Sequence, residues 1–239
     1  MTISIKGEGE LATDWRLKYC RNMIKSDFSH VQTWVFDLDN TLYPPSARLF
    51  DQIEVLMTNY VVDALGVDRK TADHLRDHYW QTYGTTLAGL MREHNVDPSP
   101  YLDVVHDIDL SGLVPDEDLR AKITALPGRK IIYTNGPKIH AERVTDARGL
   151  DGIFDAMYGV EHANYLPKPE RAAFDVVFGL DGFDPNTAAM FEDDHRNLKA
   201  PNSMGMKCVL VGPEHPQKAA HIHHQTTNLA AFLSQIVDA

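Results

Sequence analysis

Short apolar runs alternate with amphipathic stretches along most of the chain. The run at 31–36 is short and β-rich, which predicts a first buried strand. Similar runs predict later strands at 130–134, 156–160, 187–191 and 206–211. Apolar residues at helical spacing predict helices at 138–150, 170–180 and 227–237, with a short helix or turn at 197–202. Strands that alternate with helices indicate a parallel sheet covered on both faces. The sequence therefore predicts an α/β fold with a Rossmann-like parallel sheet.

Residues 45–126 interrupt this alternation, because every element predicted there is a helix. Apolar positions recur at helical spacing in the segments 46–65, 69–83, 85–94, 101–108 and 115–126. Gly66 and Gly84 are well placed to end the first two of these helices. We therefore expect two domains: a core formed by residues 1–44 and 127–239, and a helical domain inserted at 45–126.

Two acidic side chains follow the first predicted strand directly. Asp37 and Asp39 flank Leu38, and the period-two alternation of an extended chain turns both carboxylates to one side. Two acids that close repel each other, so a cation, a proton or a positively charged ligand is expected to share their site. The alternative is a pair of solvated loop aspartates.

Polar residues also follow the later strands. In open parallel sheets, ligands bind outside the carboxyl ends of the strands, so the loops that follow the strands should converge. These loops offer acids for a hard cation, a hydroxyl, an amide and a lysine, which phosphoryl transfer requires. Thr134 alone would be an ordinary strand-end residue and Lys168 alone a solvated lysine, but their positions after successive strands favour one shared site. The residues in question are Thr134, Asn135, Lys168, Glu192, Asp193 and Asp194.

Composition narrows the class of protein. The chain has 239 residues, 43% of them hydrophobic, and a formal net charge of −11, which argues against a nucleic-acid partner. Cys20 and Cys208 are far apart and suggest neither a disulfide framework nor a metal site, which fits a reducing cytoplasm. The polar, acidic N-terminus lacks a signal-peptide core, and no stretch approaches the roughly 18 apolar residues of a membrane span. We expect a cytoplasmic monomer or homodimer without a membrane partner.

Several of the twelve histidines gather near the C-terminus. A closed zinc site would need its ligands on a rigid frame. We instead expect a solvated loop for this group, which comprises His215, His221, His223 and His224.

Four short motifs occur in order on the predicted strands and loops: FDLDNTL at 36–42, IYTNG at 132–136, KP at 168–169 and FEDD at 191–194. In their order and spacing they resemble the haloacid dehalogenase superfamily and, within it, the pyrimidine 5′-nucleotidase-like branch. The resemblance covers roughly residues 31 to 212. It implies a Rossmann-like core, a helical cap inserted after the first strand, and a magnesium-dependent phosphatase acting on a small phosphorylated metabolite.

The resemblance implies a role for each matching residue. Asp37 would be the nucleophile that forms an aspartyl-phosphate, and Asp39 the general acid and base, with a pKa raised by the crowded carboxylates. Thr134 and the main-chain amide of Asn135 would bind the phosphate. Lys168 would neutralise the phosphate and Asp37 as a mobile point charge.

Magnesium would be held by Asp37, the main-chain carbonyl of Asp39, and Asp193. The acidic motif departs from the family pattern, because Glu192 stands where Asp or Gly is commoner and Asp194 where a small hydroxyl residue is usual. Asp193 is our choice as the direct ligand because Asn197 follows four residues later, as in the family. Asp194 or Asn197 could bind through water, and the choice among 192, 193 and 194 stays open.

The inserted helices suggest the substrate. The segment YGTTLAGL at 83–90 resembles a cap segment of the pyrimidine-nucleotidase branch and favours a nucleoside monophosphate. The cap candidates for substrate contact are Tyr83, Thr85, Thr86 and His106. A helix break with ordinary core leucines is the alternative interpretation of this segment.

Other functions fit less well. A phosphatase for another small ester, such as a sugar phosphate, is the nearest alternative, and a phosphomutase would differ in the cap. A dehalogenase is disfavoured because Asp39 supplies a leaving-group acid that dehalogenation does not use. A phospho-accepting signalling domain places its acceptor on a later strand and has no long insert. A non-catalytic binding protein would not need the complete set of Asp37, Asp39, Thr134, Lys168 and Asp193.

Overall fold

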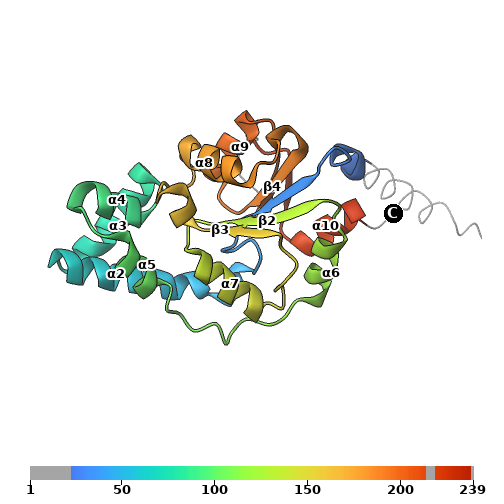
Figure 1. Cartoon of the computed structure of the whole chain (residues 1–239). Helices are drawn as coiled ribbons and strands as arrows, with labels where there is room; N and C mark the ends of the chain where they lie inside the picture. The colour runs from blue at the N-terminus through green and yellow to red at the C-terminus, as the bar shows by residue number, and fades with distance from the viewer. Residues whose placement is uncertain (1–22, 214–218, 238–239) are drawn as a thin grey trace, which may run out of the picture.

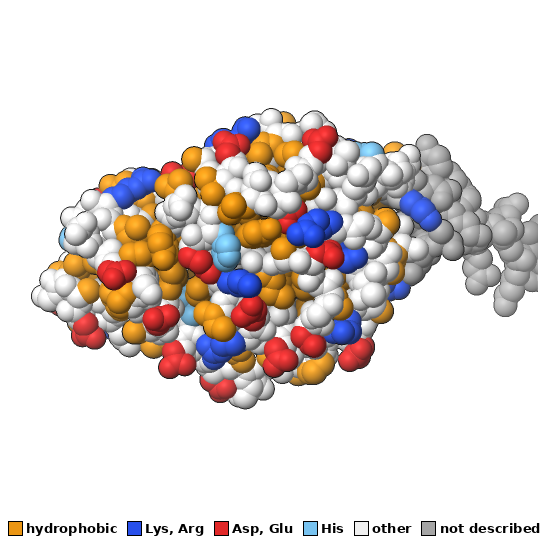
Figure 2. Space-filling model, in the orientation of Figure 1, with side chains coloured by type: hydrophobic (Ala, Val, Ile, Leu, Met, Phe, Trp, Pro, Cys, Tyr) orange, Lys and Arg blue, Asp and Glu red, His pale blue; other side chains and the backbone are white. Residues whose placement is uncertain are grey.

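The computed structural model describes residues 23–213 and 219–237 (Figure 1). Some of our predictions concern residues outside these ranges, namely the N-terminal segment, Cys20 and His215. Within the described ranges, none of the helices is long and apolar enough to cross a membrane. On the face in Figure 2, Lys and Arg side chains are interspersed with Asp and Glu side chains.

Six parallel strands form one sheet in the order β3-β2-β1-β4-β5-β6, which confirms the predicted α/β class. The strands are β1 (Thr33–Phe36), β2 (Arg129–Tyr133), β3 (Ala156–Tyr158), β4 (Ala188–Glu192), β5 (Lys207–Val211) and β6 (His224–Thr226). In the register, Phe36 at the end of β1 lies opposite Ile132 of β2 and Phe191 of β4. The residues that follow these three strands therefore start from the same level of the sheet.

Helices cover both faces of the sheet (Figure 1). One face packs against α6 (Glu117–Ala125), α7 (Lys138–Ala147) and α10 (Leu229–Val237), and the other against α8 (Arg171–Asp181) and α9 (Lys199–Ser203). Side chains of β1 alternate between the two faces: Trp34 and Phe36 join the first hydrophobic cluster, and Val35 joins the second. Burial on both faces explains why the strand sequence is a continuous apolar run.

A separate group of helices follows β1 and lies at one end of the molecule (Figure 1). After a short 3-10 turn (Pro45–Ala47), it comprises α2 (Leu49–Leu65), α3 (Arg69–Tyr83), α4 (Thr86–His94) and α5 (Pro98–Val105). These helices share their own hydrophobic cluster, which includes Tyr79. Gly89 lets α4 approach α3, because a Cβ there would lie 2.1 Å from the Cγ of Tyr79. We call α2–α5 the cap.

The packing of α6 differs from the predicted domain boundary at residue 126. Leu119 and Ile123 belong to the cluster beneath the sheet, where α6 packs against α10. The sequence predicts a helix at 115–126 but does not indicate which surface this helix covers. The cap of the structure therefore ends with α5, before α6.

Strand β6 and the contacts of the two neighbouring residues His223 and His224 were not predicted. His224 lies on β6 and its Nε2 is 2.8 Å from Asp27 Oδ2, while the Nδ1 of His223 accepts a hydrogen bond of 3.0 Å from the Cys208 amide. The prediction of a solvated loop is therefore wrong for His224, whereas His223 is exposed and lies in the bend before the strand. A three-residue edge strand of sequence HQT has no apolar run by which it could be recognised.

Candidate active site

The carboxyl ends of the central strands bring most of the predicted site residues together. Asp37 follows β1, Thr134 follows β2, and Glu192 ends β4, while Lys168 comes from the loop before α8. They line a cleft of about 560 Å³ between the sheet and the cap. The sheet's loops contribute acids and Lys168, and the cap contributes aromatic and apolar side chains such as Trp80.

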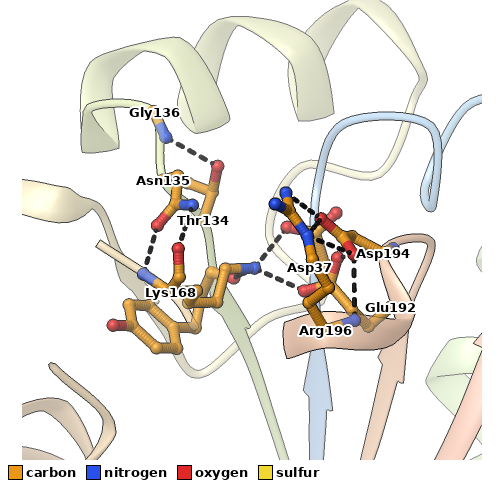
Figure 3. Close-up of polar contacts among 9 residues, drawn as sticks. Asp37, Thr134, Asn135, Gly136, Lys168, Glu192, Asp194 and Arg196 are labelled. Atoms are coloured by element: carbon orange, nitrogen blue, oxygen red, sulfur yellow. Dashed lines mark hydrogen bonds and ion pairs between the residues drawn. The ribbon is translucent and has the colours of Figure 1, made fainter. Parts of the chain in front are cut away.

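Lys168 is held in place by three acceptors (Figure 3). Its Nζ lies 2.6 Å from Asp37 Oδ1, 2.6 Å from Glu192 Oε2 and 3.0 Å from the Tyr133 carbonyl oxygen. The side chain is only 1% exposed. Burial lowers the pKa of Lys168, but the charges of Asp37 and Glu192 outweigh it and raise the pKa above its usual value. The structure thus shows Lys168 as a buried partner of Asp37 and Glu192, and its predicted role as a mobile point charge stays a prediction.

Three carboxylates share this one ammonium. Oxygens of Asp37, Glu192 and Asp193 lie within 4.8 Å of one another. Burial, helped by the charge of Glu192, raises the pKa of Asp37 to about 8. Burial also raises the pKa of Glu192 to about 7 and that of Asp193 to about 7. Three ionised carboxylates beside one ammonium would leave this buried cluster with net negative charge, which favours protonation or a bound cation.

The residues fit a magnesium ion. Hard oxygen donors with excess negative charge are the ligands that Mg²⁺ prefers. Glu192 is already engaged, since Oε2 binds Lys168 and Oε1 accepts a hydrogen bond of 3.2 Å from the Asp194 amide. Asp37 and Asp193 are therefore the side chains that would hold the ion, as the sequence predicts.

The two predicted water-mediated ligands differ in their surroundings. The carboxylate of Asp194 is bound by the guanidinium of Arg196 at 2.6 Å, and this guanidinium lies 3.7 Å above the ring of Trp80 in the cap. The carboxylate of Asp194 is thus paired with Arg196, and through Arg196 it links the loop after β4 to the cap. Asn197 is buried, and among the described residues its Oδ1 has no hydrogen-bond donor.

Asp39 has a different environment from Asp37. Its Oδ1 accepts a hydrogen bond of 2.7 Å from the hydroxyl of Tyr43 and lies 3.1 Å from Nε2 of His140. Burial alone would raise the pKa of Asp39, but the charge and hydrogen bond of His140, with that of Tyr43, bring it down to about 2. The prediction of a raised pKa for Asp39 is therefore wrong for the protein without a bound ligand. The neighbouring hydrogen-bond donors lower this pKa more than the other carboxylates raise it.

The predicted phosphate-binding residues organise the loops. Oγ1 of Thr134 accepts a hydrogen bond of 2.9 Å from the Gly136 amide. The side chain of Asn135 bonds both the amide and the carbonyl of Lys168, at 2.8 and 3.1 Å (Figure 3). Asn135 therefore fixes the backbone from which the lysine extends.

Three of the four predicted cap residues line the cleft. Thr85, Thr86 and His106 do so, and Thr85 also caps α4 by accepting a hydrogen bond of 3.2 Å from the Ala88 amide. Tyr83 lies outside the lining, and its hydroxyl donates to Glu93 at 2.7 Å. The predicted role of Tyr83 in substrate binding therefore has no support in the cleft.

Sequence reasoning missed several residues of the site. Glu192 was considered only as a metal ligand and not as a partner of Lys168. Tyr43, in the loop four residues after Asp39, and His140, in the first turn of α7, were not considered. The signal that could have found His140 is its position near the start of the helix that follows β2, directly beyond the strand end. The contact of Arg196 with Trp80 has no local sequence signal.

In the absence of magnesium, we expect the free energy of unfolding to decrease as the pH rises. The pKa values of Asp37, Glu192 and Asp193 are raised in the folded state to about 8, 7 and 7, so the folded protein binds protons that the unfolded chain releases. Their contribution is complete below the ordinary carboxyl pKa of about 4 and is lost as the pH passes through the folded values.

Urea unfolding between pH 5 and pH 8, in EDTA and in excess Mg²⁺, tests this expectation. Magnesium should flatten the pH dependence because it binds the ionised carboxylates. A flat profile in EDTA, or one that rises with pH, would contradict it.

The chain is similar to known proteins both in sequence and in fold. The family model described as haloacid dehalogenase-like hydrolase matches residues 31–205. Phosphate metabolism protein 8 of Saccharomyces cerevisiae is 28% identical over 198 residues, which are 75% of this chain and 61% of that protein. The chain thus spans less than two thirds of the length of this relative.

Two solved structures illustrate the shared fold. CbbY from Rhodobacter sphaeroides, in complex with phosphate, has a TM-score of 0.59 and 19% identity, with 87% of this chain and 100% of that chain covered. YfnB from Bacillus subtilis, bound to magnesium, has a TM-score of 0.56 and 15% identity, with 87% and 99% covered. At these identities, the similarity concerns the fold.

Proposed function

Since this chain belongs to the haloacid dehalogenase-like hydrolases, we propose that it is a magnesium-dependent phosphatase that forms an aspartyl-phosphate on Asp37. The observation that carries the proposal is the position of Asp37 at the end of β1. Its Oδ1 is bound by the buried ammonium of Lys168, and its carboxylate lines the cleft beside Asp193. The name of the yeast relative, a phosphate metabolism protein, supports a phosphorylated substrate.

The residues divide the reaction into two displacements. Asp37 attacks the phosphorus, a new P–O bond forms, and the ester P–O bond breaks as Asp39 gives its proton to the departing oxygen. A water then forms a bond to the phosphorus and gives a proton to Asp39, the P–O bond to Asp37 breaks, and inorganic phosphate leaves. Negative charge of the bound phosphate favours the protonated form of Asp39 that the first step needs. When bound, magnesium supplies positive charge that neutralises the phosphate and the carboxylates.

For the substrate, we propose a nucleoside 5′-monophosphate, preferably a pyrimidine one. The cap segment 83–90 supports this choice, together with the size of the cleft, about 560 Å³. Its lining combines aromatic surface from Trp80 and Tyr101 with hydroxyls from Thr85 and Thr86. Flat apolar surface with a few hydrogen-bonding groups suits a nucleobase.

A phosphate-release screen tests the reaction and the substrate separately. Nucleoside monophosphates, sugar phosphates and, for halide release, a 2-haloacid are each assayed with Mg²⁺ and with EDTA. Magnesium-dependent release of phosphate from UMP or CMP far above purine nucleotides is expected. Equal rates on sugar phosphates would overturn the substrate proposal alone, whereas halide release without phosphatase activity would overturn the reaction.

A further inference from the structure

Among the described residues, the hydrogen-bond partners of the Asp39 carboxylate all lie at one oxygen, Oδ1. Oδ1 accepts from the Tyr43 hydroxyl at 2.7 Å and lies 3.1 Å from Nε2 of His140. Tyr43 follows Asp39 by four residues, whereas His140 comes from α7, 101 residues further along the chain. Because an ionised carboxylate only accepts hydrogen bonds, Nε2 of His140 must carry the hydrogen.

The other oxygen, Oδ2, has no hydrogen-bond donor in the part of the chain that the structure describes, 23–213 and 219–237. Asp39 lines the cleft, and its side chain is 17% exposed. The two oxygens of one carboxylate are therefore in different environments: Oδ1 is saturated by protein donors and Oδ2 is available to a ligand.

The two donors are rigidly packed. The side chain of His140 is 0% exposed and Tyr43 is 1% exposed. The ring of His106, from the end of α5, lies 4.8 Å from that of His140. Gly136 makes room for this pair, since a Cβ there would lie 3.2 Å from Nε2 of His106 and 3.4 Å from Cδ2 of His140. A buried, close-packed pair of donors keeps the carboxylate in one orientation.

We propose that Tyr43 and His140 are positioning residues that hold Asp39 by Oδ1, so that Oδ2 is the oxygen that transfers the proton. This inference rests on the proposed phosphatase function. In the first displacement the Oδ2–H bond breaks and its proton goes to the ester oxygen, which keeps the electron pair of the broken P–O bond. In the second, Oδ2 takes the proton of the attacking water. Neither Tyr43 nor His140 gives up a proton.

The leaving group distinguishes positioning from a merely structural role. An alkoxide is a poor leaving group and needs the proton of Asp39, whereas p-nitrophenolate departs with little protonation. The value of kcat/KM reports the steps up to the departure of the leaving group. A misoriented Asp39 should therefore reduce kcat/KM for an alkyl phosphate and spare p-nitrophenyl phosphate.

The experiment compares kcat/KM for the best alkyl phosphate of the screen with that for p-nitrophenyl phosphate. Tyr43→Phe and His140→Phe should each lower the alkyl value on the order of 10²-fold and the aryl value less than about 3-fold. His140→Gln returns an N–H donor and should recover much of the alkyl activity.

Tyr79→Phe is the control. It removes another buried hydroxyl, which bonds Nε2 of His94 in the cap at 2.6 Å, and it should affect both esters equally.

Equal losses on the two esters, or no loss on either, would overturn the positioning role. Tyr43→Phe keeps the inference testable if His140→Phe does not fold. Wild-type protein that hydrolyses neither ester would overturn the proposed function and this inference with it. Wild-type hydrolysis of both esters, with variants that lose both equally, would overturn this inference alone.

Discussion

Asp37→Asn should abolish phosphate release, with kcat lowered by a factor on the order of 10⁴ or more. The amide is a poor nucleophile and cannot form the acyl-phosphate. Its carbonyl oxygen can still accept from the Nζ of Lys168, which now lies 2.6 Å from Oδ1, so the loops should stay in place. Steady-state release of inorganic phosphate from the best substrate of the screen measures the effect.

A matched substitution separates chemistry from folding. Asp63→Asn replaces an exposed aspartate on α2 and should retain wild-type turnover. Both variants should show the circular dichroism spectrum of the wild type. Turnover by Asp37→Asn within tenfold of the wild type would rule out the aspartyl-phosphate mechanism.

Lys168→Met should destabilise the protein by about 3–5 kcal/mol at pH 8, because it leaves buried carboxylates without their counter-charge. Asp37 and Glu192 each lose a contact of 2.6 Å, and both remain buried. Phosphatase activity should be lost as well. Urea unfolding in EDTA measures the difference in the free energy of unfolding from the wild type.

The pH dependence of this deficit identifies its cause. Without the ammonium, the pKa values of Asp37 and Glu192 rise further above about 8 and 7. The folded variant then keeps protons that the folded wild type releases above pH 7, so the deficit should grow as the pH rises from 7 to 9. Lys207→Met is the control, since Lys207 lies 3.6 Å from a half-exposed Asp27, and its loss should cost less than about 1 kcal/mol. A Lys168→Met deficit no larger than this, or independent of pH, would contradict the assignment.

The strands of the sheet were predictable where their side chains are buried, because a buried strand has a run of apolar residues. Strands β1, β2, β4 and β5 are buried on both faces, so each is an apolar run that ends within a residue or two of the predicted position. The short edge strands differ: β3 was predicted too long, and β6 was missed because its three residues are polar and only partly buried. Helix α5 begins before the predicted residue 101, since Asp97 caps it and Pro98 occupies its first turn.

The site was predictable to the extent that it follows from the parallel sheet. Asp37, Thr134 and Glu192 meet because neighbouring parallel strands end at one edge. What their side chains do there depends on partners that are distant in sequence. The ammonium of Lys168 bridges two acids from different strands, and the pKa of Asp39 is low because His140 reaches it from α7. Neither contact can be inferred from local residue spacing.

The central position of β1 has a consequence for how the molecule fluctuates. Hydrogen bonds to β2 and β4 protect its amides from both sides, and the Asp37 amide donates to the Phe191 carbonyl at 2.9 Å. Such amides exchange with solvent only when the whole sheet opens, whereas the cap, with its own hydrophobic cluster, can open locally. We therefore expect Asp37, the proposed nucleophile, to follow the slowest-exchanging backbone of the described residues, so that opening of the cap to admit or release ligands would leave it undisturbed.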